Sequence, residues 1–293
     1  MDEKEILIIK KYSGRFPKLL VLGWFLGLSM YAGSIFACWF LNFSIFPAFV
    51  IASLSSFMLF SSMHSAAHNH FSVGGFKGLN AFIGHSSATV TQFSFTQFAK
   101  LHKDHHENTN IKGEDPDYVR LNSPMRAVAY STKSYFVQVL CAIPVINNVV
   151  ISRLPKFGRD RIKKYTTSFS IWQVRLTYVV LFASLYFGFA EYVLGLWIIP
   201  HLVNRFRLII FFMWLPHKTG ETSFYRNTRA QITPIVDGIS FVKEMDYHLI
   251  HHLYPSVPLS NLKKVYIELT ENLNKNNCAI TNRITGEPWH SIK

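Results

Sequence analysis

The sequence predicts an all-α integral membrane protein, with four transmembrane helices in two hairpins and a cytosolic helical cap. Composition is the first reason: the 293 residues are 49% hydrophobic and 16% charged, which is typical of membrane proteins. The second reason is that residues 19–68 contain no Asp, Glu, Lys or Arg. That stretch suits two bilayer crossings of about 20 residues each. A second pair of apolar segments follows a long polar region.

The first hairpin is predicted at residues 19–41 and 46–68, with Asn42 at the turn, and the second at residues 171–190 and 192–215. At a rise of about 1.5 Å per residue, each segment can cross a hydrocarbon core of about 30 Å. No small-residue cleavage site follows the first segment, so we expect it to be retained rather than removed as a signal peptide. The whole chain, 1–293, is predicted to be one membrane domain, whose cap comprises residues 69–170 and 216–293.

Two further apolar stretches are not expected to cross the bilayer. Residues 79–99 are uncharged, but ten of these 21 residues are His, Asn, Gln, Ser or Thr. Residues 137–146 are too few to span and contain Pro144. Both are predicted to be interfacial or re-entrant. With four crossings, the two termini and every histidine cluster lie on the same side of the membrane.

The distribution of positive charge predicts that this side is cytosolic. Five Lys or Arg residues precede the first crossing, thirteen lie between residues 69 and 170, and none lies in the two short turns. This is the positive-inside pattern. The net charge of +13 is then explained by anionic lipid headgroups of the bilayer or an acidic redox partner, and no nucleic acid is expected as a partner.

The fourth crossing contains polar residues near its middle, and the sequence permits two interpretations. These residues are Pro200, His201, Asn204, Arg205 and Arg207. Either the helix is broken or starts late, or this face lines an active-site cavity. The abundant aromatic residues are expected to be lipid-facing or interfacial packing, and they do not by themselves predict a substrate tunnel. The C-terminal tail is predicted to form a solvated helix at residues 259–273, followed by a polar stretch.

Eight of the thirteen histidines form three clusters, one HxxxH and two HxxHH. The clustered residues are His64 and His68; His102, His105 and His106; and His248, His251 and His252. Histidines three or four apart share a helical face, so each cluster can present several imidazoles to metal. Eight imidazoles are too many for one ion, and a dinuclear site is the simplest stoichiometry. Two irons fit an imidazole-rich, open site better than zinc, whose structural sites take four ligands and commonly use cysteine.

Other polar residues are candidates for the same site. His217 follows the fourth crossing and is a ninth candidate ligand. The three cysteines are scattered, so any metal is expected to be held by nitrogen. Metal-bound imidazoles usually donate their other N–H to an acceptor behind them. The candidates for this supporting role are Asn108, Asp115, Asp117 and Asp246. By contrast, His70, His85 and His290 are interpreted as ordinary core or surface groups.

Together these motifs resemble the integral membrane fatty-acid desaturase and hydroxylase superfamily, over about residues 19–262. The sequences NTN (108–110) and DPD (115–117) look like the family's usual continuation of its second box. The sequences LPHK (215–218), RNTR (226–229) and DYHLIHHLYPSVP (246–258) resemble the carotenoid β-ring hydroxylase and ketolase branch. Ser65 is a departure, because many members have Asp directly after the first histidine.

The resemblance implies a mushroom-like fold and a non-haem centre of two Fe ions, with O2 as co-substrate. It also implies oxidation of unactivated C–H bonds of a membrane lipid, with electrons from a separate ferredoxin-like or other donor. Hydroxylation or ketolation of a carotenoid-like isoprenoid is the first hypothesis. A fatty-acyl desaturase or acyl hydroxylase is the alternative, because the boxes are shared. A non-enzymatic membrane metal-binding protein is a remote third, since transporters usually place ionisable ligands at mid-membrane depth.

Overall fold

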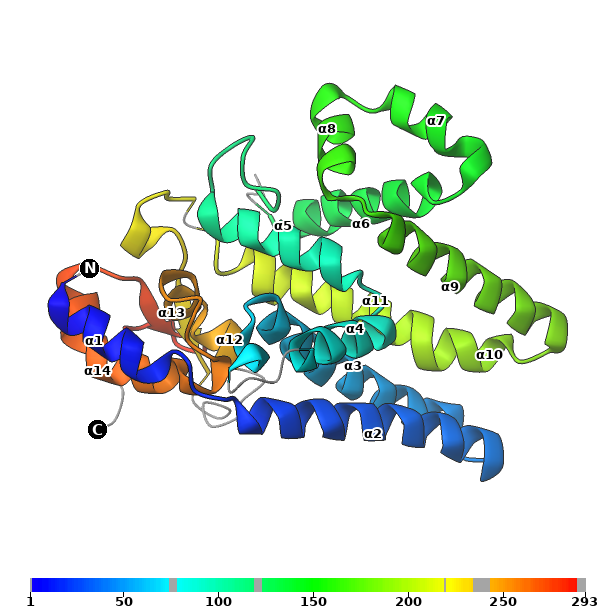
Figure 1. The fold of residues 1–293 in the computed structure, drawn as a ribbon, viewed down its shortest axis with the longest axis horizontal. Helices are drawn as coiled ribbons and strands as arrows, with labels where there is room; N and C mark the ends of the chain where they lie inside the picture. Colours follow the sequence, from blue (N-terminus) through cyan, green and yellow to red (C-terminus); the bar gives the residue numbers. More distant parts are fainter. Residues whose placement is uncertain (1, 74–77, 119–122, 219, 234–242, 289–293) are drawn as a thin grey trace.

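The computed structural model describes residues 2–73, 78–118, 123–218, 220–233 and 243–288. Four of its helical segments are long and apolar enough to cross a membrane, which confirms the predicted all-helical membrane class. Figure 1 shows that the turns of both hairpins lie at one end of the molecule, opposite the two chain termini. Helices α12, α13 and α14, which follow the second hairpin, lie near the termini.

The first hairpin consists of α2 (Lys18–Phe40) and α3 (Ile45–Ala67). Both helices form because uninterrupted apolar residues bury backbone hydrogen bonds within the helix, as the hydrocarbon core requires. They approach closely at Gly27, where an added Cβ would lie 3.0 Å from Leu59 Cγ. At the same point the Ser55 hydroxyl donates a hydrogen bond to the Gly27 carbonyl oxygen, at 2.6 Å. A small residue therefore sets the spacing of this hairpin.

The second hairpin consists of α9 (Ser168–Phe187) and a long composite helix. The latter runs through α10 (Ala190–Val193), η2 (Leu194–Ile198), α11 (Ile199–Leu208) and η3 (Ile209–Trp214). Gly188 has φ +78°, a left-handed conformation that ends α9 and suits glycine. The turns of the two hairpins touch, because the ring of Trp39 lies 5.8 Å from that of Phe189 and 5.6 Å from that of Tyr192.

The composite helix is continuous from residue 190 to residue 214, rather than broken near Pro200. Two π-helical stretches, η2 and η3, flank α11. Pro200 is the second residue of α11. Proline has no N–H group to donate, and the wider π-helical turn before it tolerates the missing hydrogen bond. Of the polar residues near its middle, Arg205 lines a cavity together with Leu202 and Leu208, so the second interpretation holds for Arg205 alone.

The segments between the hairpins are helical but do not add a crossing. They are η1 (His70–Ser72), α4 (Leu79–Thr91), α5 (Phe95–Glu107), α6 (Pro124–Cys141), α7 (Pro144–Arg153) and α8 (Lys156–Tyr165). With 13 residues, α4 covers about 20 Å, which is less than the hydrocarbon core of about 30 Å. The expected apolar stretch at residues 137–146 is divided between α6 and α7, and Pro144 begins the second of these.

The remaining elements complete the cap. They are η4 (Phe224–Arg226), β1 (Ala230–Ile232), α12 (Lys243–Asp246), α13 (His248–Leu253), η6 (Leu259–Asn261), α14 (Leu262–Lys275) and β2 (Ile280–Asn282). The two short strands pair in parallel, with Ala230 opposite Ile280, and the sequence did not predict them. Helix α14 is not simply solvated as expected, because Leu262, Val265 and Leu269 are buried.

The N-terminal helix α1 (Glu3–Tyr12) was also not predicted, and it packs beside α14 (Figure 1). Its Glu5 is fully buried and accepts hydrogen bonds from the hydroxyls of Tyr225 and Tyr254. This carboxylate ties the N-terminus to the segments on both sides of α13. Since α13 carries the third histidine cluster, the N-terminal helix helps to fix that cluster in place.

Candidate metal centre

The fold brings all nine predicted histidines together from four separate segments. Helix α3 supplies the first cluster, α5 the second and α13 the third, while His217 follows directly after the composite helix. Their facing ring nitrogens form two sets in which every member lies within 4.8 Å of the others. The first set is His64, His68, His102, His106 and His251, and the second is His105, His217 and His252. His248 adjoins the second set.

The first set is centred on His102. Its Nε2 atom lies 2.6 Å from Nε2 of His64, 3.0 Å from Nε2 of His68 and 3.0 Å from Nε2 of His106. The His251 ring lies 4.6 Å from the His64 ring and closes this set. One imidazole cannot share a proton with three others at once, so hydrogen bonding alone does not account for this convergence.

The second set lies directly beside the first. The rings of His106 and His252 are stacked across the boundary, with centroids 4.2 Å apart. The His217 ring lies 4.8 Å from that of His105 and 5.0 Å from that of His252. His248 approaches from α13, with its Nε2 atom 3.1 Å from Nε2 of His217. Two adjacent nitrogen-lined positions result.

The residues present fit two metal ions. Metal–nitrogen bonds of about 2.1 Å place two ligands about 3.0 Å apart at right angles and about 4.2 Å apart when opposite. Nε2 of His68 and Nε2 of His106 each lie 3.0 Å from Nε2 of His102, as two ligands at right angles would, and the facing nitrogens of each set all lie within 4.8 Å of one another. Within the described part of the chain, both ring nitrogens of His251 and Nε2 of His252 lack a hydrogen-bond partner, although both side chains are buried. Unsatisfied buried nitrogens are costly, and a metal ion would satisfy them.

The electrostatics of the cluster keep most of its imidazoles neutral. Burial, reinforced by the neighbouring histidines, lowers the pKa of His68, His102, His106, His217, His251 and His252 well below the usual value. Neutral imidazole is the form that binds metal, so these groups need not lose a proton at neutral pH. His105 differs. Burial opposes its protonation, but the hydrogen bond and charge of Asp115 outweigh burial and raise the pKa of His105.

Two polar residues support the histidines from behind. Asp115 is buried, and its Oδ1 atom lies 2.8 Å from Nδ1 of His105. The backbone N–H groups of Asn110 and Asp117 donate to the same carboxylate and hold it in place. Thr109, which sequence reasoning did not single out, has its hydroxyl 3.2 Å from Nδ1 of His252. Its place in the NTN motif is the signal that could have identified it.

The other three supporting candidates are placed differently. The Asn108 side chain donates to the carbonyl oxygen of Asp104 at the end of α5. Asp117 lies on the wall of the cavity described below, 3.7 Å from Arg161. Asp246 accepts hydrogen bonds from the backbone and hydroxyl of Thr233 and pairs with Arg283 at 3.1 Å. Asn108 thus stabilises the backbone at the end of α5, and Asp246 connects segments of the cap around the site.

Histidines outside the nine have other surroundings. Nε2 of His70 lies 2.9 Å from the Pro255 carbonyl oxygen, and burial lowers the pKa of His70 to about 4. The ring of His85 packs edge-on against Phe95. His201 is buried against the rings of Phe93 and Tyr135. His290 lies outside the described residues.

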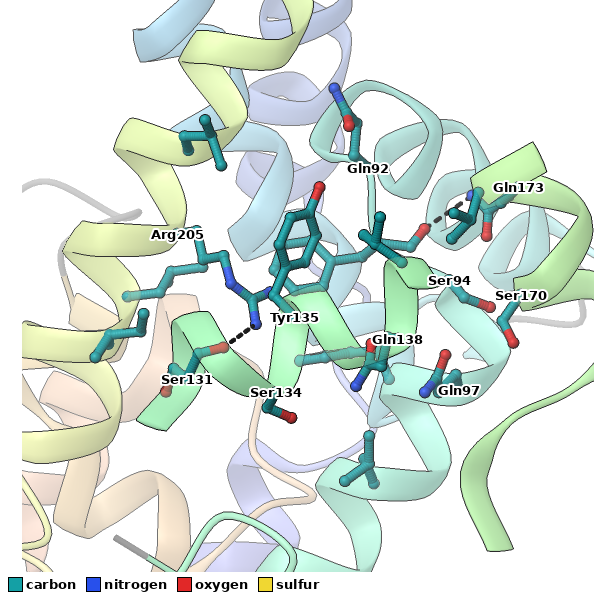
Figure 2. A pocket seen from close by; sticks show the side chains of 18 of the residues that line it. Gln92, Ser94, Gln97, Ser131, Ser134, Tyr135, Gln138, Ser170, Gln173 and Arg205 are labelled. Atoms are coloured by element: carbon teal, nitrogen blue, oxygen red, sulfur yellow. Dashed lines mark hydrogen bonds between the residues drawn. The ribbon is translucent and has the colours of Figure 1, made fainter. Parts of the chain in front are cut away.

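A cavity of about 820 Å³ opens onto the cluster. His102, His105 and His217 form part of its wall. The exposed wall is otherwise mostly apolar and rich in aromatic side chains, and polar side chains from α6, α9 and α11 and from the region between α4 and α5 also line it (Figure 2). The sequence offered a cavity only as one of two interpretations of the fourth crossing, and it did not predict the aromatic wall, because those residues have no spacing that separates them from lipid-facing ones.

The cavity extends deep along the composite helix. Trp197 and Met213 both line it, and 16 residues of helix separate them by roughly 24 Å. Its volume falls within the usual range of small-molecule sites, about 300–1,000 Å³. A long apolar molecule could therefore lie in it with one end at the histidines.

Comparison with known proteins agrees with this architecture. The fatty acid desaturase family model matches residues 39–283, which include all three histidine clusters. A β-carotene ketolase from one Paracoccus sp. strain is 28% identical over 232 residues, covering 76% of this chain and 81% of the relative. A β-carotene ketolase from a second Paracoccus sp. strain is 26% identical over 233 residues, with the same coverage.

The family match, the four apolar helices and the buried histidine cluster all describe one kind of protein. It is an integral membrane oxidoreductase that acts on lipid-like substrates. The resemblance to carotenoid ketolases and hydroxylases places it near that branch. The chain belongs to the fatty acid desaturase family.

Proposed function

We propose that this protein is a di-iron oxygenase that hydroxylates or ketolates a ring-bearing, carotenoid-like isoprenoid in the membrane. One observation carries the proposal: two adjacent sets of buried imidazoles face the end of a deep apolar cavity. The family match and the two β-carotene ketolase relatives support the same activity.

The histidines are proposed to hold one iron in each set. The first iron would be bound by His64, His68, His102, His106 and His251, and the second by His105, His217, His252 and the adjoining His248. Iron is favoured over zinc because the donors are nitrogen-rich and the described part of the site contains no cysteine. When bound, the two irons would activate O2 with two external electrons and so oxidise an unactivated C–H bond.

The protein's own groups orient this chemistry. The carboxylate of Asp115 holds the tautomer of His105 by accepting its Nδ1–H, so that Nε2 faces the metal position. Thr109 is placed to do the same for His252. Phe212 packs 5.2 Å from the ring of His64 and 4.7 Å from that of His248, and it helps to exclude water from the cluster.

We propose that the cavity determines which substrate is bound. Its wall combines broad aromatic faces with sparse polar groups, which suits a rigid apolar molecule entering from the bilayer. The resemblance of residues 215–218 and 246–258 to the carotenoid branch favours a ring at the reacting end. An acyl chain is the competing occupant, because it also fits an apolar cavity.

The sidedness and the electron source are also proposals. Both termini and the cluster lie opposite the hairpin turns, and the positive-inside pattern favours the cytosol for that end (Figure 1). Helices α5 and α8 expose Lys103, Lys156 and Arg159. These cations would suit a separate acidic donor such as a ferredoxin-like protein.

The deciding experiment is product identification. Cells that express the chain would be supplied with β-carotene or with shorter β-ring isoprenoids, and all lipids would be analysed by mass spectrometry. We expect an isoprenoid product that gains one oxygen atom, with or without loss of two hydrogens. Unchanged isoprenoids together with new double bonds or hydroxyls in acyl chains would instead establish the acyl desaturase or hydroxylase alternative.

The metal is tested separately on the purified protein. We expect about two irons per chain, bound by nitrogen ligands. A different stoichiometry, or zinc in place of iron, would contradict the di-iron assignment.

A further inference from the structure

Arg205 is a cation in the wall of the apolar cavity. It lies on α11 within the fourth transmembrane segment and is largely withdrawn from solvent. Its Nη2 atom donates to the Ser131 carbonyl oxygen at 3.2 Å, and its guanidinium lies 4.7 Å from the Tyr135 ring centroid. Figure 2 shows Arg205 and Tyr135 side by side on the cavity wall. These contacts position the guanidinium but leave its charge unbalanced.

No carboxylate lies within 4.0 Å of Arg205 in the described part of the chain, and its Nε–H has no hydrogen-bond partner there. The described wall carries one other arginine, Arg161, which pairs with Asp117 at 3.7 Å. The charge of Asp117 also acts on Arg205 from farther away, but among the described residues only Arg161 forms an ion pair with it. An unbalanced cation in an apolar site is costly unless an acceptor or anion joins it.

The neighbouring arginine on the same helix is held by contacts with other side chains of the protein. Arg207 donates two hydrogen bonds to Oδ1 of Asn204 and lies 3.5 Å from the Phe57 ring centroid. It is not part of the cavity wall. Arg205 lines the cavity and has a donor to spare, so its missing partner is expected inside the cavity.

Arg205 stands at a definite depth below the histidines. Seven residues separate it from Phe212, which packs against His64 and His248, and this is roughly 10 Å of helix. The cavity continues beyond Arg205 as far as Trp197. A bound lipid therefore passes Arg205 after about 10 Å, measured from the reacting end.

We propose that Arg205, whose guanidinium lies over the Tyr135 ring, binds a carboxylate or carbonyl oxygen of the substrate. This proposal rests on the proposed function and narrows its class of substrate. The preferred substrate is then an isoprenoid lipid already oxidised about 10 Å from the carbon that this protein attacks, rather than a pure hydrocarbon. An oxidation or cleavage reaction that creates this oxygen function must come first. Planar guanidinium suits such oxygens because it offers several donors in one plane.

Binding tests the proposal without turnover. Purified iron-loaded protein would be titrated with retinoic acid and with the hydrocarbon in which a methyl group replaces its carboxylate. Quenching of tryptophan fluorescence would report occupancy, because Trp172 and Trp197 line the cavity. We expect the acid to bind roughly tenfold to a hundredfold more tightly, the range of a charge-assisted hydrogen bond. Oleic acid and its matching alkene form a second arm that separates straight acyl chains from β-ring isoprenoids.

Two variants decide the origin of any selectivity. Arg205→Met should abolish the preference for the acid and leave hydrocarbon binding nearly unchanged. Arg207→Met, two residues further on, should retain the preference, because that side chain lies outside the cavity. Equal binding of acid and hydrocarbon by the unaltered protein would overturn the proposal, as would a preference that survives in Arg205→Met.

Turnover of the same ligands separates this proposal from the proposed function. Selective binding without oxidation of any isoprenoid would leave the Arg205 site in place and contradict the proposed function. Oxidation of acid and hydrocarbon with equal kcat/KM, together with equal binding, would support the proposed function and contradict the Arg205 site.

Discussion

At the scale of single residues, the site consists of neutral imidazoles that face one another. They have too few N–H groups for every ring nitrogen to take part in a hydrogen bond. His102 approaches three other histidines within 3.0 Å, and His251 has two unsatisfied ring nitrogens among the described residues. Such a cluster is destabilising unless metal occupies it. Substitutions in and around the cluster should therefore change the metal content and the stability of the fold to different extents.

His251→Ala should abolish turnover and lower the iron content of the purified protein. The imidazole belongs to the first set, and its ring lies 4.6 Å from that of His64. Iron analysis and product assays test this, and membrane insertion should be unaffected. His85→Ala is the matched control, since His85 packs on Phe95 away from the cluster. Retained iron and activity in His251→Ala would remove this residue from the ligand set.

Asp115→Asn should weaken metal binding rather than abolish it. The amide cannot accept the His105 Nδ1–H as strongly, and loss of such a partner typically costs about 10–100-fold in metal affinity or activity. Competition with a chelator would measure the affinity. Asp160→Asn, at an exposed ion pair on α8, should leave it unchanged. Equal metal affinity in the Asp115 variant and the unaltered protein would contradict the supporting role.

At the scale of elements, close helix contacts depend on small residues. An added Cβ at Gly84 on α4 would lie 2.5 Å from the Phe95 ring at the start of α5. Gly84→Ala should therefore destabilise the protein by about 1–3 kcal/mol through overpacking. Gly23→Ala in α2 meets nothing within 4 Å and should be neutral or slightly stabilising.

Thermal unfolding of both alanine variants in detergent would measure this contrast. If Gly84→Ala unfolds at the same temperature as Gly23→Ala, the tight contact between α4 and α5 does not exist.

The contact between α1 and α14 should depend on pH. The hydrogen bond from Lys11, with that from Tyr12, lowers the pKa of Glu268 below its usual 4.5. A lowered carboxyl pKa stabilises the fold above pH 4.5, and this contribution disappears as pH falls through the folded-state pKa. Glu268→Gln should thus lower the Tm at pH 6 to 7 by a small amount, since the pair is partly exposed.

The Tm difference between the Glu268→Gln variant and the unaltered protein should shrink below pH 4.5. Comparing the two proteins at each pH cancels the titration of the histidines, which both share. A difference that grows as pH falls would contradict the assigned sign.

At the scale of the whole molecule, the histidine cluster joins the transmembrane helices to the cap. The nine histidines come from α3, α5, α13 and the end of the composite helix, so metal would bridge segments far apart in sequence. Any ion that binds only the folded state stabilises it, by about 2.7 kcal/mol at 100 times its Kd. Removal of iron should therefore lower the Tm of the entire protein, and addition of ferrous iron should restore it.

The His251→Ala variant serves as the control for metal removal, because it should respond less to the chelator. An unchanged Tm after verified loss of iron would mean that the cap is held by the protein contacts alone.

Much of this architecture follows from local chemistry. The four apolar segments predict helices because no other backbone conformation satisfies its hydrogen bonds in lipid, and their even number places the histidine clusters at one end. By contrast, β1 and β2 have three residues each and pair across some fifty residues of chain, so no local sequence pattern predicts them. Helix α1 has a local signal that could have predicted it, the capping box of Asp2 and Glu5, whereas its packing on α14 depends on the tertiary structure.

The sequence by itself determined the helical membrane class, the candidate ligands and the family, because hydropathy and histidine spacing are local properties. Tertiary structure alone decided that the histidines divide into two adjacent sets, that Asp115 and Thr109 support them, and that a deep cavity ends at them. It also decided that Arg205 faces that cavity while Arg207 does not. The reason is physical: burial, pairing and the shape of a cavity depend on which distant segments pack together, and residue spacing along one helix does not specify that.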